Sequence, residues 1–532
     1  MKKEKIESYK DVGFAIDPNN NINLNPDNLE KVKTLLNSKG PGFCLAKWQQ
    51  VTLHLGAGTT HSCHHPTPHK IPLKELENNP SALHNTKFKK EQRKIMLEGG
   101  KPSECDFCWR IEKDNGNSDR FLKSIEPWAL PYYNEIINYS GDENIEPTHL
   151  EVDFSNICNQ QCIYCGPEYS STWVKDLKEN GPIKLFEDTK LSHLGQGYQD
   201  LDSIVYKNKK DNPYIDAYWK WFPTIYDNLK VYRITGGEPL MSKETFRTMD
   251  WLYENPNRNL EFCINSNFSV PNELWNKFIK KLKKIKSNKV KKITIYTSIE
   301  GWGERAEYSR RHMNFKLLQQ RVEEIALLGN VRCVMMCTFN IFSITSFQQF
   351  LEWVLELKCK YNPNKHMTTV ENDTGYVFKE HYQRTNNKNS DQAVIIGIDI
   401  PYLRHPQFLD AQYCTEDLVE KYLLPMTDWM SRNIQNPTYT CHQGFETYEF
   451  EKMKRITFQR IYFNKQKELQ RDTDKGILIN RAKFYQFITQ IDKRWDTNFL
   501  KVYPEMNNFY NTCKAANNTV LSDINRFTEF NK

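Results

Sequence analysis

Three cysteines within eight residues constrain this chain more than any other feature of its sequence. Cys158, Cys162 and Cys165 follow a short alternating run, Glu151–Phe154, that predicts a β-strand. Three thiolates so close together can converge on one soft metal centre. They do not complete the four ligands of a structural zinc ion, and Glu168 is a poor fourth. On a four-iron cluster, three cysteines leave one iron open to another molecule.

The C-x3-C-x2-C spacing, with Tyr164 before the last cysteine, resembles the signature of the radical S-adenosylmethionine (SAM) enzymes. The resemblance implies that Cys158, Cys162 and Cys165 ligate a 4Fe-4S cluster whose open iron is chelated by the amino and carboxylate groups of SAM. The alternative is three buried or incidental cysteines.

The resemblance extends to the ends of the next predicted strands. Val231–Thr235 runs into a Gly-Gly-Glu-Pro turn, which in the family holds the SAM amino group; glycines let a backbone approach a ligand closely. Leu260–Asn267 ends where the family often carries Thr-Asn, and Lys292–Gly301 resembles S-x-D-G with Glu in place of Asp. Glu307–Arg310 resembles E-Y-x-R. Because Arg311 is adjacent, the arginine that matches the motif is either Arg310 or Arg311. The implied SAM contacts are Tyr164, Gly236, Gly237, Glu238, Pro239, Asn267, Ser298, Glu300 and Arg310.

Strands and helices alternate from residue 146 to 401, which predicts parallel βαβ units of the α/β class. With strands at Val331–Asn340 and Ala393–Pro401, six strands are expected, and the resemblance implies a partial (β/α)6 TIM-like barrel. In such barrels the chemistry lies at the C-terminal ends of the strands. We interpret 361–392 as a loop insertion and 402–532 as a mainly helical C-terminal region. Its Phe484–Arg494 segment resembles the closing helix of twitch-bearing enzymes.

A second cysteine set precedes the barrel, in residues 39–130. A cysteine comes before a predicted hairpin (Gln50–Leu55 and Thr59–Cys63), another stands at its return, and a helix, Thr86–Glu98, leads to a C-x2-C pair. This order resembles the twitch domain, the shorter relative of the SPASM domain, although twitch domains usually follow the barrel. The resemblance implies an auxiliary 4Fe-4S cluster held by Cys44, Cys63, Cys105 and Cys108.

Zinc is the alternative metal for this second set, because tetrahedral zinc accepts mixtures of Cys and His. Four histidines crowd Cys63, namely His61, His64, His65 and His69. The neighbouring three-cysteine motif favours iron and sulfur instead. With four cysteines available, we expect the histidines to be surface or anion-binding residues.

Packing roles are predicted for several other residues. Residues 1–38 should form an N-terminal arm with a short helix at Pro26–Leu36. Phe88, Ile95 and Met96 are the expected inner face of the helix Thr86–Glu98. Alternation on the fifth strand predicts a core role for Cys333, Met335 and Cys337, with a hydrogen-donor role as the alternative. Cys414, Cys441 and Cys513 should be packing residues, and Cys441-His442 are alternative contributors to a substrate pocket.

Composition limits the location and partners of the chain. A net charge of +7 over 532 residues permits an anionic substrate without demanding nucleic acid. No apolar run approaches the roughly 20 residues of a membrane span. No apolar region follows the charged N-terminus, so we expect no secretory signal. Fourteen cysteines then favour metal ligation in a cytoplasmic setting.

The resemblance implies a function. The protein would cleave SAM reductively to a 5′-deoxyadenosyl radical, which abstracts hydrogen from a peptide or protein side chain or from a small metabolite. Flavodoxin or ferredoxin would supply the electron, and the auxiliary cluster would accept an electron or anchor the substrate. No catalytic side chain is assigned beyond the cluster. The alternatives are an RNA-modifying radical SAM enzyme and a non-catalytic zinc-binding interaction protein.

Overall fold

The computed structural model describes residues 26–186, 211–285, 289–362, 364–372, 375–383, 395–434, 444–462 and 475–530. The chain divides into two compact units. The first comprises residues 1–156, 202–264 and 287–292, and the second comprises 157–201, 265–286 and 293–532. Strands β7 and β8 contribute residues to both.

The first unit contains short helices and most of the sheet. Its elements are α1 (Pro26–Lys39), α2 (Ala46–Gln49), β1 (Gln50–His54), β2 (Thr59–His61), β3 (His69–Lys70), α3 (Leu73–Leu76), α4 (Lys87–Leu97), α5 (Asp106–Lys113), α6 (Asp119–Ser124), α7 (Tyr133–Ile136), β4 (His149–Asp153), α9 (Pro213–Ile225), β6 (Val231–Thr235), α10 (Lys243–Glu254) and β7 (Asn257–Ser266).

The second unit continues with alternating helices and strands and ends in long helices. Its elements are β5 (Gln161–Cys162), α8 (Ser171–Asn180), α11 (Asn272–Ile285), β8 (Val290–Ser298), α12 (Glu304–Ser309), β9 (Arg310–Arg311), α13 (Phe315–Ala326), β10 (Arg332–Met336), α14 (Phe347–Tyr361), β11 (Asn364–Asn372), β12 (Gly375–Gln383), β13 (Ile396–Asp399), α15 (Glu416–Leu418), α16 (Leu424–Arg432), α17 (Thr447–Lys454), α19 (Lys475–Trp495), α20 (Phe499–Val502) and α21 (Asn507–Phe530).

Nine strands form one sheet in the hydrogen-bonded order β13-β10-β8-β7-β6-β4-β1-β2-β3. The pairs β1–β4, β4–β6, β6–β7, β8–β10 and β10–β13 are parallel, and β1–β2 and β2–β3 are antiparallel. The predicted α/β class with a mostly parallel sheet is therefore confirmed. Six of the strands, from β4 to β13, neighbour one another in chain order, and the hairpin β1–β2 extends the same sheet.

The strand sequences explain this arrangement. In β6, Tyr232 and Ile234 are fully buried while their neighbours are half-exposed, which is the period of two expected of a strand. In β10, three successive residues from Cys333 to Met335 are buried, as in a parallel strand covered on both faces. Cys333, Met335 and Cys337 are all fully buried, which confirms their core role.

The predicted helix at Pro26–Leu36 exists as α1, and it is part of the core of the first unit. Val32, Leu35 and Leu36 are fully buried and belong to one apolar cluster with Phe43 and Trp48. The second half of the expected N-terminal arm is therefore a packed helix.

The inner face of α4 differs from the prediction. Met96 is buried as expected, but Phe88 and Ile95 are 38% and 36% exposed. Lys89 and Arg93 are buried instead, and with Met96 they form the i, i+4, i+7 stripe of one helix face. The apolar periodicity predicted the wrong inner face because the buried face of α4 carries basic side chains that are hydrogen-bonded.

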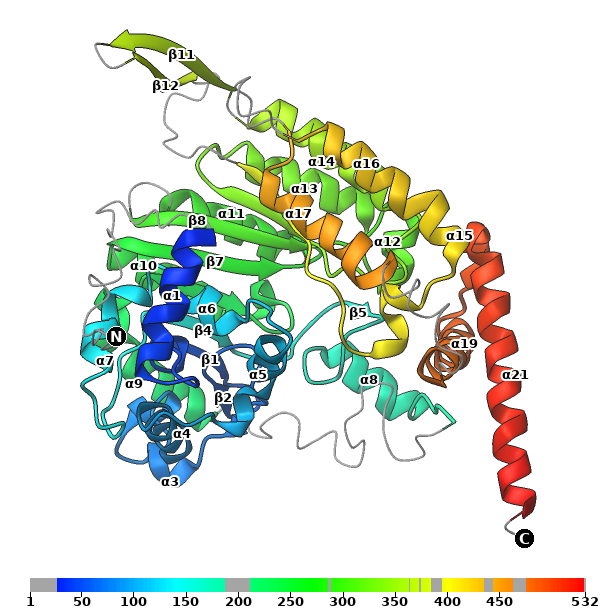
Figure 1. The fold of residues 1–532 in the computed structure, drawn as a ribbon, viewed down its shortest axis with the longest axis horizontal. Coiled ribbons are helices and arrows are strands. Elements are labelled where there is room, and N and C mark those ends of the chain that lie inside the picture. The colour runs from blue at the N-terminus through cyan, green and yellow to red at the C-terminus, as the bar shows by residue number, and fades with distance from the viewer. Residues whose placement is uncertain are drawn as a thin grey trace, which may run out of the picture. The chain divides into compact units, whose positions relative to one another are not determined.

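The expected loop insertion at 361–392 is also corrected, because β11 and β12 form a nine-pair antiparallel hairpin there. The C-terminal region is mainly helical, as predicted, and α19 and α21 run side by side (Figure 1). In the part of the chain that the structure describes, no helix has both the length and the apolarity to cross a membrane.

Two lysines on α14 provide a test of the second unit's core. Lys358 forms a fully buried ion pair with Glu449 at 2.9 Å, and Glu449 also accepts the backbone N–H of Ile398 in β13. We expect Lys358→Ala to lower the free energy of unfolding by about 3–5 kcal/mol, because it leaves a buried carboxylate unpaired. Lys360→Ala, which removes an exposed pair with Glu323, should leave the urea midpoint nearly unchanged. Equal midpoints in the two variants would contradict the role given to the buried pair.

Candidate functional site

The loop that carries Cys158, Cys162 and Cys165 is held by backbone hydrogen bonds in the second unit. Strand β5 pairs antiparallel with β9, which places Cys162 opposite Arg310. The Ile163 N–H donates to the Ser309 carbonyl at 2.8 Å, and the Trp173 indole N–H donates to the Cys162 carbonyl at 2.9 Å. The cysteine loop and the segment that resembles E-Y-x-R are therefore adjacent.

Arg310 carries a buried charge beside the cysteines. Its Nε donates to Glu300 Oε2 at 2.7 Å, its Nη1 lies 3.3 Å from Cys162 Sγ, and its Cζ lies 5.5 Å from the centre of the Tyr164 ring. Arg310 and Glu300 are only 6% and 2% exposed. Burial alone would lower the pKa of Arg310, but Glu300 raises it well above the usual value, so the charge is retained.

Of the two adjacent arginines, Arg310 is therefore the one that faces a cysteine sulfur. The side chain of Arg311 lies 3.3 Å from the amide oxygen of Gln161 instead. Glu300, which stands where the family has Asp, holds the guanidinium through both of its oxygens.

Nitrogen donors also approach the sulfur of Cys158. The backbone N–H of Gln160 lies 3.4 Å from Cys158 Sγ, and Asn267 Nδ2 lies 3.8 Å from it. Asn267 is oriented by a second contact, 2.9 Å to Asn159. Donors aimed at cysteine sulfurs are one of the means by which proteins tune iron-sulfur clusters. Burial raises the pKa of both the Cys162 and Cys165 thiols, a shift that metal ligation reverses.

The other predicted residues of this unit lie near the end of β8. Ser298 is its last residue, is half-buried, and stands opposite Met336 in the register. Burial, and after it the Glu300 carboxylate, raise the pKa of Cys337 well above its usual value. A fully buried thiol of this kind fits the packing role.

The C-terminal helices anchor α12, the helix that leads into Arg310, and sequence reasoning missed this role. The Tyr308 hydroxyl donates to Asp492 at 3.0 Å. Arg305 forms a bidentate ion pair with Glu505 at 2.9 and 3.0 Å, and the Tyr503 hydroxyl donates to the Arg305 carbonyl. The sequence signal was the Phe484–Arg494 and Tyr503–Glu505 stretch, whose partners could not be identified from the sequence.

The Gly-Gly-Glu-Pro turn follows β6 in the first unit. Gly236 has a φ of +115°, and a Cβ there would lie 2.3 Å from Asp153 Oδ1. The Gly237 N–H donates to the carbonyl of Ser155, which precedes the cysteine loop in sequence. The buried Glu238 side chain accepts the Leu240 N–H at 3.0 Å and so caps the short 3-10 turn that Pro239 begins.

The second cysteine set surrounds a cavity within the first unit. Its atom-free space is about 420 Å³, including the part open to solvent. The residues lining it are Cys44, Ala46, Lys47, Ser62, Cys63, His65, Pro66, Met96, Cys105, Cys108, Trp109, Asp119, Arg120 and Lys123. All four predicted ligands therefore face one space, although they come from distant parts of the sequence. Burial raises the pKa of Cys63 and of Cys108 to about 12.

Buried cations accompany these four thiols. Lys47 is paired with Glu104. Among the residues that the structure describes, Lys89 bonds to the Thr60 hydroxyl and His84, and Arg93 bonds to Asn85, His84 and backbone carbonyls. Burial and the neighbouring Arg93 and Lys47 hold the pKa of Lys89 well below its usual value. Negative charge on Cys63 would raise the pKa of Lys89, and negative charge on Cys105 and Cys63 raises the pKa of Lys47. These lysines therefore lie where they would stabilise thiolate ligands.

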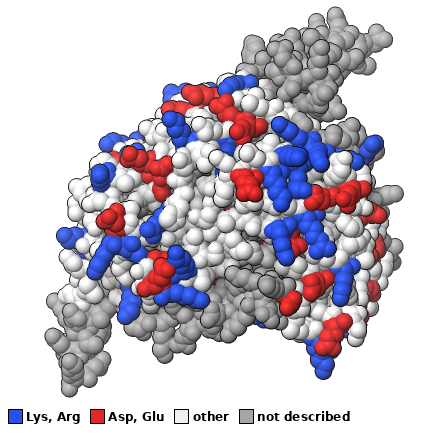
Figure 2. Space-filling model, turned by 180° about the vertical axis from the view of Figure 1, so that it is seen from behind, with Lys and Arg blue, Asp and Glu red and all other residues white. Residues whose placement is uncertain are grey.

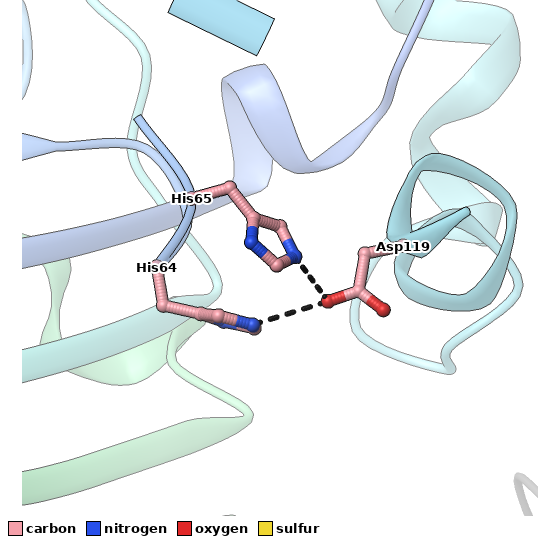
Figure 3. Close-up of side chains that lie close together, drawn as sticks. All are labelled: His64, His65 and Asp119. Atoms are coloured by element: carbon pink, nitrogen blue, oxygen red, sulfur yellow. Dashed lines mark hydrogen bonds and ion pairs between the residues drawn. The ribbon is translucent and has the colours of Figure 1, made fainter. Parts of the chain in front are cut away.

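The four histidines near Cys63 do not all lie on the surface, which differs from the prediction. His61 is buried, its Nε2 lies 3.0 Å from Nε2 of His54, and burial lowers its pKa to about 3. His69 contacts the Thr86 hydroxyl at 3.0 Å. His64 and His65 both reach Asp119 (Figure 3).

The remaining predicted cysteines divide into two cases. Cys414 and Cys513 are fully buried, which confirms packing. Cys441 and His442 lie outside the described residues.

No protein-family model, curated protein or solved structure that we compared matches this chain. The family resemblance therefore rests on the motifs and their surroundings.

Two glycines with positive φ test the geometry of the turn. Gly236→Ala should destabilise the first unit by more than the roughly 1–3 kcal/mol of backbone strain, because its new Cβ also meets the Asp153 carboxylate. Gly99→Ala, at φ +85° with nothing within 4 Å, should show the strain alone. Urea denaturation of both variants measures the difference. A Gly236→Ala protein as stable as Gly99→Ala would show that the turn is not tightly packed.

Proposed function

We propose that this chain is a radical SAM enzyme that carries a SAM-binding 4Fe-4S cluster and an auxiliary 4Fe-4S cluster. Cys158, Cys162 and Cys165 would hold the first cluster. When bound, this cluster and SAM would supply a 5′-deoxyadenosyl radical, formed with methionine by one-electron cleavage of the SAM carbon–sulfur bond, with the electron drawn from a flavodoxin or ferredoxin.

The observation that carries the proposal is the environment of the three cysteines. A loop that merely packs three thiols has no need of a buried arginine. Here a bidentate Glu300–Arg310 pair directs a guanidinium at Cys162, and an amide is directed at Cys158. Such donors stabilise the negative charge of thiolate ligands. Arg310 and Asn267 are also residues that the motifs alone had selected.

These side chains would position SAM and exclude water. Arg310 retains a positive charge for the SAM carboxylate, and Tyr164 offers a half-buried ring beside it. Ser298 and Glu300 end the neighbouring strand. In the first unit, Gly236 to Pro239 would offer backbone groups to the SAM amino group, while the Glu238 side chain rigidifies the turn.

The finer fold assignment is a partial (β/α)6 barrel. The six strands from β4 to β13 follow chain order in the sheet, without the reversal that defines doubly wound folds. On this assignment the proposed cofactor residues follow β4, β6, β7 and β8, at the ends where barrel enzymes place their chemistry.

The proposed auxiliary cluster rests on the cavity of the first unit. Four cysteines that line one cavity, with the buried Lys47 close to two of them, suit a 4Fe-4S cluster with four protein ligands. With no open iron, electron transfer is its expected role, and substrate anchoring is the alternative.

We propose a peptide, a protein side chain or a small metabolite as the substrate, in preference to RNA. Lys and Arg are interspersed with Asp and Glu on the face drawn in Figure 2. Nucleic-acid binders concentrate positive charge on one face instead. The net charge of +7 is modest for a chain of this length.

Iron analysis and SAM cleavage test the proposed chemistry together. Anaerobically purified protein should contain about eight iron and eight sulfide per chain. Cys162→Ala should lose about half of both and all formation of 5′-deoxyadenosine. Cys513→Ala, which removes a buried cysteine outside both sets, should retain both. A colourless zinc protein, or cleavage that survives Cys162→Ala, would contradict the proposal.

The two adjacent arginines allow a matched test of SAM binding. Arg310→Lys should weaken SAM binding at least about tenfold, because lysine cannot reproduce the bidentate pair with Glu300. Arg311→Lys should change the Kd little, since that side chain contacts Gln161. Equilibrium binding to the iron-loaded protein measures both values. Similar losses in the two variants would argue against Arg310 as the SAM ligand.

A further inference from the structure

Three side chains beside the four-cysteine cavity converge outside the cysteine set. His64 and His65 follow β2, and Asp119 is the first residue of α6. Nε2 of His64 lies 3.1 Å from Asp119 Oδ2, and Nε2 of His65 lies 2.8 Å from the same oxygen (Figure 3). All three ligand atoms lie within 4.8 Å of one another.

These separations match the edges of a coordination site. With metal–nitrogen and metal–oxygen bonds of about 2.0–2.2 Å, neighbouring ligands of an octahedral or tetrahedral ion lie about 2.8–3.6 Å apart. Both nitrogen–oxygen distances fall in this range. Each imidazole contacts the same Asp119 oxygen through its own Nε2 atom. A cation placed between these three atoms would therefore replace the hydrogen atoms of the two contacts.

The surroundings hold the ligands while leaving one side open. The side chain of His65 is 5% exposed, and its ring stacks on Phe107 with centroids 3.7 Å apart. His65 and Asp119 also line the cysteine cavity. His64 is 55% exposed, so solvent reaches the site from its side.

We propose that His64, His65 and Asp119 form a mononuclear site for a divalent transition-metal ion, with Zn²⁺ as the reference ion. Two imidazoles and one carboxylate, without sulfur, are a donor set of catalytic zinc and of non-haem Fe²⁺. The remaining positions are open to water or to an oxygen or nitrogen donor of a bound molecule. The site shares no ligand with either cysteine set and does not depend on the proposed SAM chemistry.

Calorimetric titration of the full-length, iron-loaded protein with Zn²⁺ tests the site. We expect one equivalent to bind, and His64→Ala and Asp119→Asn each to weaken it by at least about ten- to a hundredfold. His69→Ala, which removes a nearby histidine whose Nε2 contacts Thr86, is the matched control and should bind as the wild type does.

Unchanged affinity in both variants, or no Zn²⁺ equivalent in the wild type, would overturn the inference. The iron content of the same samples shows whether the cysteine sites are intact, and thermal unfolding shows whether the protein is folded. A variant that loses only the proposed zinc site should match the wild type in both measurements. Should Asp119→Asn fail to fold, His64→Ala decides the question, because its exposed side chain supports no core.

Discussion

The site of the second unit depends on the buried guanidinium of Arg310. A charge with so little access to water must be matched by opposite charge and by hydrogen-bond acceptors. Glu300 supplies a bidentate carboxylate, and Cys162 presents its sulfur to the third nitrogen. The short β5–β9 pairing brings these groups together, and the C-terminal helices hold α12 through Tyr308 and Arg305. The C-terminal helices are therefore connected to the cysteine loop through α12 and Arg310, and also through α8, where Arg494 forms an ion pair with Asp176.

The same physical constraint, that a buried basic side chain needs opposite charge or hydrogen-bond acceptors, applies in the first unit. Lys89 and Arg93 are buried on one face of α4 without carboxylate partners among the described residues, and Lys47 has only Glu104. Four thiols that become thiolates on binding metal would supply negative charge close to Lys47 and Lys89.

Local sequence patterns predicted the elements well and the side-chain partners poorly. Alternating apolar residues located β4, β6 and β10, and the cysteine spacings selected residues that the fold brings together within each unit. Periodicity failed on α4, since Phe88 and Ile95 satisfy a hydrophobic pattern while the helix buries Lys89 and Arg93 for their hydrogen bonds. The choice of Arg310 over Arg311, and the anchoring by Asp492 and Glu505, depend on contacts between distant segments that no local pattern encodes.

The central claim is that the three-cysteine loop holds a cluster with one iron left open for SAM. Electron paramagnetic resonance of the anaerobically reduced protein, recorded with and without SAM, tests it most directly. We expect the signal of one cluster to change when SAM is added, and the signal that persists in Cys162→Ala to be insensitive to SAM. A spectrum unaltered by SAM, or a reduced protein without any cluster signal, would contradict the account.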